Sequence, residues 1–122
     1  MCEILFRGKG INDKEWRYGF YTEQQGYPYI TPDGVAMYEI DANTAGQYTG
    51  FVDKNGKKIF EGDIVCMDDW IPPCMQVAYA QGAFYLAEIE KPVKYYGDIY
   101  YLNHGGNPCA KVIGNIYDDL SY

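Results

Sequence analysis

The side chains best suited to catalysis are few, because the chain has one serine, one histidine and four cysteines. Ser121 is the penultimate residue, and a chain terminus does not hold a nucleophile against its base. A cysteine nucleophile would have to use His104, with Cys109 five residues further along a loop rich in glycine and proline. That spacing matches no motif in which a base activates a nucleophile. The sequence therefore predicts no catalytic residue, a protein that is not an enzyme, and a loop position near the surface for His104.

Metal binding would depend on the cysteines, which are Cys2, Cys66, Cys74 and Cys109. A zinc site of three cysteines and one histidine would need the last three of them together with His104. Seven residues separate Cys66 from Cys74, whereas paired zinc ligands usually have about two to four between them. We therefore predict no metal and no cofactor, and expect the cysteines to be small, buried thiols. Their scattered positions, without a CxxC pair, favour a reduced protein of the bacterial cytoplasm.

Two loops superficially resemble ion-binding motifs. A calcium loop that began at Asp53 would need oxygen ligands at the positions occupied by Lys57 and Ile64. The stretch from Gly8 to Gly10 lacks the frame of a phosphate-binding loop. Neither loop therefore predicts a ligand.

Aromatic side chains are the most abundant resource for binding, since the chain contains 14 tyrosines. Four of them cluster near one another in the sequence: Tyr95, Tyr96, Tyr100 and Tyr101. Tyrosine supplies large, rigid contact area at protein interfaces. The alternative is ordinary packing within strands, where aromatic residues are enriched. This cluster is the predicted interface, for a homo-oligomer or for another protein.

The charge is uneven along the chain. Residues 1–60 carry seven Lys or Arg and eight Asp or Glu, whereas residues 61–122 carry three and nine. Because binding to a phosphate backbone depends on Lys and Arg, the acidic second half argues against nucleic acid as a partner. A module that stacks aromatic faces on single strands remains the alternative. No apolar run approaches the roughly 20 residues of a membrane-spanning helix, and we expect no membrane association.

The elements that must position these residues are mostly strands, recognised from alternating apolar residues between turn residues. In one strand, from Glu15 to Thr22, residues Trp16, Tyr18 and Phe20 lie on one face and Arg17, Gly19 and Tyr21 on the other, and one face is buried. The other predicted strands are Cys2–Arg7, Tyr27–Thr31, Val35–Asp41, Gln47–Val52, Lys57–Phe60, Ile64–Met67, Met75–Tyr79, Ala83–Ile89 and Lys111–Tyr117. The segment Lys94–Leu102 fits either a strand or a short helix.

Turn residues define how these strands connect. Asn55-Gly56 predicts a hairpin with a type I′ turn, and Gln81-Gly82 predicts a second hairpin. Glu61-Gly-Asp63 predicts a sharp bend, which makes its acidic residues, like Asp53, weak candidates for catalysis. Ala42–Gly46 predicts a loop or one helical turn, capped by Asn43 or Thr44.

Several of these motifs occur together in one family. The stretches Gly46-Gln-Tyr-Thr-Gly50, Asp53-Lys-Asn-Gly56, Ile59-Phe-Glu-Gly-Asp-Ile-Val65 and Val112-Ile-Gly-Asn-Ile-Tyr117 resemble the YopX family of phage and prophage proteins. The resemblance implies a mainly β fold, with an N-terminal strand group and a C-terminal SH3-like, partly open barrel. The resemblance covers essentially the whole chain, so we expect a single domain, residues 1–122, and the order of the predicted strands places a subdivision near residue 43, into 1–43 and 44–122. The resemblance implies oligomers, makes a host or phage protein the alternative partner, and transfers no catalytic residue. The expected function is that of a non-enzymatic interaction or self-assembling module encoded by a phage or prophage, with a nucleic-acid-associated barrel as the alternative.

Overall fold

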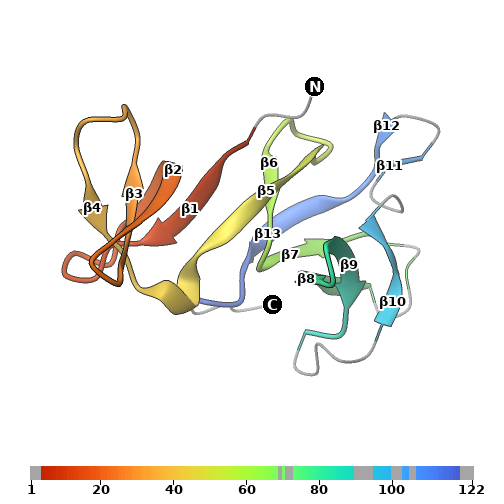
Figure 1. Cartoon of the computed structure of the whole chain (residues 1–122). Helices are drawn as coiled ribbons and strands as arrows, with labels where there is room; N and C mark the ends of the chain where they lie inside the picture. The colour runs from red at the N-terminus through yellow and green to blue at the C-terminus, as the bar shows by residue number, and fades with distance from the viewer. Residues whose placement is uncertain are drawn as a thin grey trace. The chain divides into compact units, whose positions relative to one another are not determined.

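The computed structural model describes residues 4–68, 70, 73–89, 95–99, 103–104 and 107–118 (Figure 1). The described residues form antiparallel strands and one short 3₁₀ turn, with no α-helix among them, which confirms the predicted mainly β class. Contacts divide the chain into two compact units, residues 1–48 and 49–122, called unit 1 and unit 2 below.

Unit 1 contains four antiparallel strands in the order β4-β3-β2-β1, followed by the start of β5. The strands are β1 (Phe6–Lys9), β2 (Trp16–Gln24), β3 (Tyr27–Thr31), β4 (Tyr38–Glu39) and β5 (Gly46–Val52). Strands β3 and β4 form a hairpin, in which β4 lies at the edge of the sheet and β3, which contains Pro28, lies between β4 and β2. The turn of this hairpin is closed by Asp33, whose carboxylate accepts hydrogen bonds from the backbone N–H groups of Val35 and Ala36.

The long strand β2 changes partners at Gly19. Its first half pairs with β1, from Lys9 opposite Trp16 to Phe6 opposite Gly19, and its second half pairs with β3. A Cβ atom at Gly19 would lie 2.5 Å from the carbonyl oxygen of Thr31. Only glycine fits this close approach of two backbones.

The connection from β4 to β5 is the predicted single turn, a 3₁₀ helix called η1 (Ala42–Thr44). Its cap is Asp41, whose side chain accepts a hydrogen bond from the Asn43 backbone N–H at 3.0 Å. The prediction of Asn43 or Thr44 as the cap was wrong, because the extended residue that precedes the turn is Asp41. Thr44 instead ties the turn to β1, where its hydroxyl oxygen accepts from the Lys9 N–H at 2.9 Å.

Unit 2 contains a five-stranded antiparallel sheet in the order β10-β9-β8-β7-β13. Its strands are β7 (Asp63–Cys66), β8 (Cys74–Ala80), β9 (Ala83–Ala87), β10 (Tyr95–Asp98) and β13 (Lys111–Asn115). The unit also contains the end of β5, which is the neighbour of β6 (Lys58–Phe60) in the other large sheet. A separate two-stranded sheet consists of β11 (Asn103–His104) and β12 (Asn107–Pro108). Both larger sheets have an open strand order among the described residues, so an SH3-like barrel stays a prediction.

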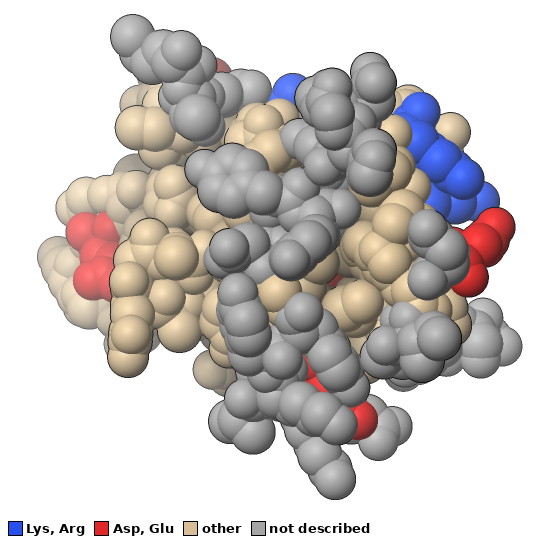
Figure 2. All heavy atoms as spheres, turned by 90° about the vertical axis from the view of Figure 1, so that its right-hand side faces the viewer, with Lys and Arg blue, Asp and Glu red and all other residues tan. Residues whose placement is uncertain are grey.

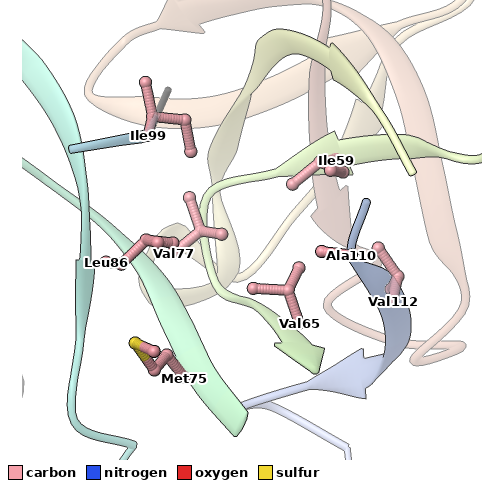
Figure 3. Close-up of a cluster of buried hydrophobic side chains, with 8 residues drawn as sticks. All are labelled: Ile59, Val65, Met75, Val77, Leu86, Ile99, Ala110 and Val112. Carbon is pink, nitrogen blue, oxygen red and sulfur yellow. The ribbon is translucent and has the colours of Figure 1, made fainter. Parts of the chain in front are cut away.

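A cluster of buried aliphatic side chains forms the core of unit 2 (Figure 3). It consists of Ile59, Val65, Met75, Val77, Leu86, Ile99, Ala110 and Val112. Six of these side chains belong to β6, β7, β8, β9 and β13. The other two are Ile99, which follows β10, and Ala110, which precedes β13. Burying one Ile, Leu or Val completely contributes about 1.5–3 kcal/mol, so this cluster is the main source of stability in the unit.

The hairpins of unit 2 were predicted correctly, but one turn type was not. Gln81 and Gly82 both have positive φ, at 52° and 81°, as a type I′ turn requires. At the β5–β6 hairpin only Gly56 has positive φ, at 82°, so Asn55-Gly56 is not a type I′ turn. Asp53 explains the difference, because its carboxylate accepts the N–H groups of Asn55 and Lys57 and fixes a wider turn.

Candidate functional site

The predicted tyrosine interface falls largely outside the described residues. Tyr95 and Tyr96 belong to β10, and nothing is described of their side chains. Tyr100 and Tyr101 lie outside the described residues, and His104 lies in β11. This surface therefore stays a prediction.

A different aromatic surface is present on the sheet of unit 1. The alternation of β2 places Trp16, Tyr18 and Phe20 on one face, as the sequence indicated. Tyr18 is 46% exposed and Phe20 is 59% exposed, while Gly19 between them is buried. The aromatic face of β2 is thus the exposed one, and the face that contains Gly19 is the buried one. The most apolar face of a strand is usually the buried one, so β2 departs from that rule.

Strand β3 extends this surface. Tyr27 lies opposite Gln24 and Tyr29 lies opposite Thr22, so their side chains share the face of Phe20. Tyr27 is 57% exposed and Tyr29 is half-buried. We call the surface formed by Trp16, Tyr18, Phe20, Tyr27 and Tyr29 the aromatic face.

Two cations from β1 border the aromatic face. Arg7 lies opposite Tyr18, and Lys9 lies opposite Trp16. The guanidinium carbon of buried Arg7 is 4.6 Å from the centre of the Trp16 ring, and the Lys9 ammonium is 5.6 Å from it. Cation–π contacts of this kind stabilise by about 0.5–2 kcal/mol. They hold the Trp16 ring in place.

Carboxylates are absent from the aromatic face on β1, β2 and β3, all of which are described. The one acidic residue in these strands, Glu23, alternates to the opposite face and accepts a hydrogen bond from the Tyr21 hydroxyl at 2.9 Å. Glu39, on edge strand β4, is the carboxylate opposite Tyr29. In a chain with 17 Asp and Glu residues, the aromatic face on β1, β2 and β3 is thus poor in carboxylates.

A shallow hollow of about 180 Å³ lies elsewhere on unit 1. Arg17 is its central group, with one nitrogen 2.6 Å from the Asp13 carboxylate and its guanidinium 4.2 Å from the centre of the Tyr38 ring. A hydrogen bond from the backbone N–H of Glu15 is the largest cause that lowers the pKa of Asp13, and the hydrogen bond from the Arg17 side chain is the next. Ile11 and Met37 line the hollow and are exposed. The hollow contains an ion pair but no nucleophile beside a base, so its geometry supports no reaction.

The buried aspartates of unit 2 have structural roles. The Asp53 carboxylate accepts N–H groups of Asn55, Lys57 and Val112 at 2.8–3.0 Å. Burial alone would raise the pKa of Asp53, but these donors outweigh burial and lower it. Asp63 accepts the Phe60 N–H at 2.8 Å. Both carboxylates are committed to turns, which makes them poor bases for catalysis.

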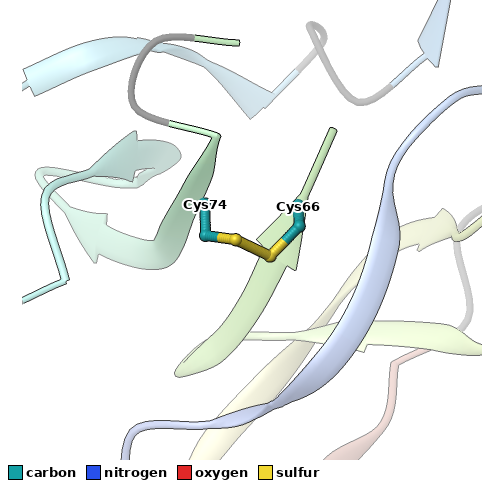
Figure 4. The surroundings of a disulfide bond; sticks show 2 residues. All are labelled: Cys66 and Cys74. Carbon is teal, nitrogen blue, oxygen red and sulfur yellow. A yellow bond between two sulfur atoms is a disulfide. The ribbon is translucent and has the colours of Figure 1, made fainter. Parts of the chain in front are cut away.

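The cysteines differ from the expectation of separate thiols. Cys66 and Cys74 form a disulfide between neighbouring strands (Figure 4). Sequence reasoning missed this pair because only the β7–β8 register, which places the two residues directly opposite, brings them together. Cys109 is half-buried and is not part of a disulfide. Among the described residues, no three or more His, Cys, Asp or Glu side chains form a group that could hold a metal.

The chain is thus a small, mainly antiparallel β protein, in which the acidic residues Asp53 and Asp63 stabilise turns. Comparison with known protein families assigns the chain to one of them. The model of the family described as YopX protein matches residues 6–120, so the chain belongs to the YopX family. No curated protein matches the chain in a sequence search. Within the described part of the chain, no helix is long and apolar enough to cross a membrane.

Proposed function

We propose that the chain is a non-enzymatic accessory protein of a phage or prophage, which acts in the bacterial cytoplasm by binding protein through the aromatic face. Its phage origin and its location rest on the family resemblance and on the sequence pattern. The observation that carries the binding role is the exposure of Tyr18, Phe20 and Tyr27 on one sheet face, where β1, β2 and β3 present no carboxylate and Glu39 lies on edge strand β4. Tyrosine and tryptophan dominate the binding energy of protein interfaces.

A second copy of the chain is the partner that this face fits best. The chain has a net charge of −7, so two copies repel each other over most of their surfaces. Contact through the aromatic face avoids this repulsion, because Arg7 and Lys9 border it and its three central strands present no carboxylate there. Two sheets that pack face to face lie about 10 Å apart, with their side chains interleaved. A homo-oligomer built in this way buries the exposed rings.

The test is a binding titration between copies. A fluorescently labelled copy is titrated with unlabelled protein, and its anisotropy is followed. Phe20→Glu places a carboxylate at the centre of the face, and we expect it to weaken self-association at least about tenfold. Tyr79→Glu is the matched control, since Tyr79 is an exposed aromatic residue of unit 2, at 45%, and we expect no change. Equal loss in both variants, or no association of the wild type, would refute a homo-oligomer formed by this face.

The predicted cluster of Tyr95, Tyr96, Tyr100 and Tyr101 is a competing surface for the same role. The same titration with Tyr95 and Tyr96 both changed to serine distinguishes the two surfaces. Loss of association in this variant but not in Phe20→Glu would assign the interface to the cluster.

A module that binds single-stranded nucleic acid is the second candidate. It is favoured by rings at every second position of β2, next to Lys9, because successive bases stack on such side chains. The acidic balance of the chain argues against it. Figure 2 shows one face of the molecule, on which described Lys and Arg side chains are visible at the upper right and, in smaller part, at the top. Binding to a labelled oligonucleotide that weakens steeply with salt would establish this role, and no binding at low salt would remove it.

For unit 2 we propose the SH3-like, partly open barrel that the family resemblance implies. Ile59 of β6 shares a buried cluster with Val77 and Leu86 of the five-stranded sheet, which supports curling of the strands around one core. An experimental structure of the chain with residues 90–106 resolved tests this directly. A flat five-stranded sheet would contradict it.

A further inference from the structure

The disulfide of unit 2 lies where the backbone alone keeps the two sulfur atoms near each other. Cys66 and Cys74 are the last directly opposed pair of the β7–β8 ladder, after Ile64 with Gln76 and Val65 with Met75. The next hydrogen bond runs from the Met67 N–H to the Pro73 carbonyl oxygen, at 2.9 Å. The cysteines therefore occupy a non-hydrogen-bonded site of an antiparallel pair, where opposite Cα atoms approach most closely. Their Cα atoms are 4.1 Å apart, so the register holds the two side chains together whether or not they are bonded.

The pair is also accessible to exchange. Both cysteines are half-buried, and they alternate to the face opposite that of the core pair Val65 and Met75. On the other side of β7, Lys111 of β13 lies directly opposite Cys66. The thiolate of a reduced cysteine is the form that attacks and re-forms a disulfide. In the cytoplasm proposed above, disulfides are mostly transient or redox-sensing.

We infer that Cys66 and Cys74 form a reversible redox site, which exchanges with a dithiol reductant and controls the packing of Trp70. In reduction, a thiolate of the dithiol attacks one sulfur of the pair and forms a mixed disulfide. The second thiol of the reductant then displaces the protein cysteine. The protein gains two electrons and two protons as two thiols, and the dithiol becomes a disulfide. Oxidation by the same couple reverses these steps.

Trp70 connects the redox state to the rest of unit 2. It lies in the connection that the disulfide closes, its N–H donates to the Met67 carbonyl oxygen at 3.1 Å, and its side chain packs against the core cluster. The closed ring limits the conformations of this connection. Reduction removes that limit and allows Trp70 to leave the core more often. This inference is independent of the aromatic face and of the proposed binding role.

The experiment is a redox titration of the full chain in buffers with set ratios of reduced to oxidised dithiothreitol. Thiols are trapped by alkylation and assigned by peptide mass. Fluorescence is read in Trp16→Phe, which leaves Trp70 as the only tryptophan, since the chain has two. We expect Cys66 and Cys74 to gain alkyl groups together, with one midpoint, and the Trp70 emission to shift with the same midpoint. We also expect the melting temperature of the reduced protein to fall by roughly 5–10 °C.

Two variants, both made in the Trp16→Phe background, control the titration. Cys109→Ser should leave the midpoint and the Trp70 shift unchanged. The double variant Cys66→Ser, Cys74→Ser should give the emission of the reduced protein at every ratio, with its fold checked by circular dichroism. If this variant does not fold, Cys66→Ala alone provides the same comparison. The inference is overturned if the two thiols never pair, if either of them pairs with another cysteine, or if they pair without any shift in the emission of Trp70.

Discussion

Units 1 and 2 use their apolar residues in opposite ways. Unit 2 buries a cluster of aliphatic side chains, and only three of its described large apolar residues are exposed: Tyr79, Ile113 and Ile116. Eight such residues are exposed in the described part of unit 1: Ile4, Ile11, Tyr18, Phe20, Tyr27, Val35, Met37 and Tyr38. Large exposed apolar patches commonly mark interaction sites. We therefore propose that unit 2 supplies most of the stability, whereas unit 1 presents the proposed binding surface.

Among the variants that test this comparison, we expect the largest loss of stability when the buried carboxylate of Asp53 in unit 2 is changed. Asp53→Asn keeps the shape of the side chain but replaces one of two acceptor oxygens by a donor, which then faces backbone N–H groups. We expect the free energy of unfolding to fall by about 2–4 kcal/mol, measured by urea denaturation. Asp33→Asn in unit 1 is the control, because its exposed carboxylate also accepts two N–H groups. An equal, small loss in both variants would contradict a special role for Asp53.

The next effect concerns the sheet of unit 1. Gly19→Ala forces a Cβ atom against the backbone of Thr31 and Pro32, and we expect a loss of about 2 kcal/mol or more in the free energy of unfolding. Gly26→Ala, at a turn with positive φ but with open space around it, should cost only the backbone strain, about 1–2 kcal/mol. If the two variants are equally stable, β2 does not pass Thr31 as closely as described.

A smaller effect is the acid dependence of Asp53. Since folding lowers the pKa of this residue from its ordinary value of 3.8, the ionised carboxylate stabilises the native state above that pH. This stabilisation is lost as the pH falls through the lower pKa of the folded state. The gap in stability between wild type and Asp53→Asn should therefore narrow below about pH 4, as measured by urea denaturation at several pH values. A gap that stays constant would contradict the lowered pKa.

The smallest effect on stability is expected on the aromatic face. Phe20→Ser removes a side chain that is already 59% exposed, so the free energy of unfolding should change by less than about 0.5 kcal/mol. Ile30→Ala, on the neighbouring strand but fully buried, should cost about 2–5 kcal/mol. A large loss in Phe20→Ser would mean that the aromatic face belongs to the core of unit 1 and is not a binding surface.

Local features of the sequence predicted most of the strands and hairpins. The two residues of the Gln81-Gly82 turn determine its shape by themselves, and the hairpin around them was predicted correctly. The turn at Asn55 differs because it is built around the Asp53 carboxylate, which also has a distant partner. The carboxylate of Asp53 bonds both the turn and the Val112 N–H, 59 residues away. A pattern of neighbouring residues contains no information about such a contact.

The candidate sites were less predictable than the fold. The alternation of residues along β2 identified the common face of Trp16, Tyr18 and Phe20. It did not tell which of the two faces of the strand is buried. The deciding residues are Gly19, which packs closely against Thr31, and Tyr21, whose ring lies 5.6 Å from that of Phe6. The glycine in the middle of the opposite face was the signal available in the sequence. The pairing of Cys66 with Cys74 similarly needed the register of two strands.

The most direct test of the proposed role is the mass of the chain in solution as a function of concentration. Sedimentation equilibrium of the wild type and of Phe20→Glu, over the micromolar range, compares the two under identical conditions. We expect the wild type to form an oligomer of defined size. We expect the variant to keep its fold and to be a monomer of 13.9 kDa. A wild type that stays monomeric throughout, or a variant that forms the same oligomer, would contradict the proposed role.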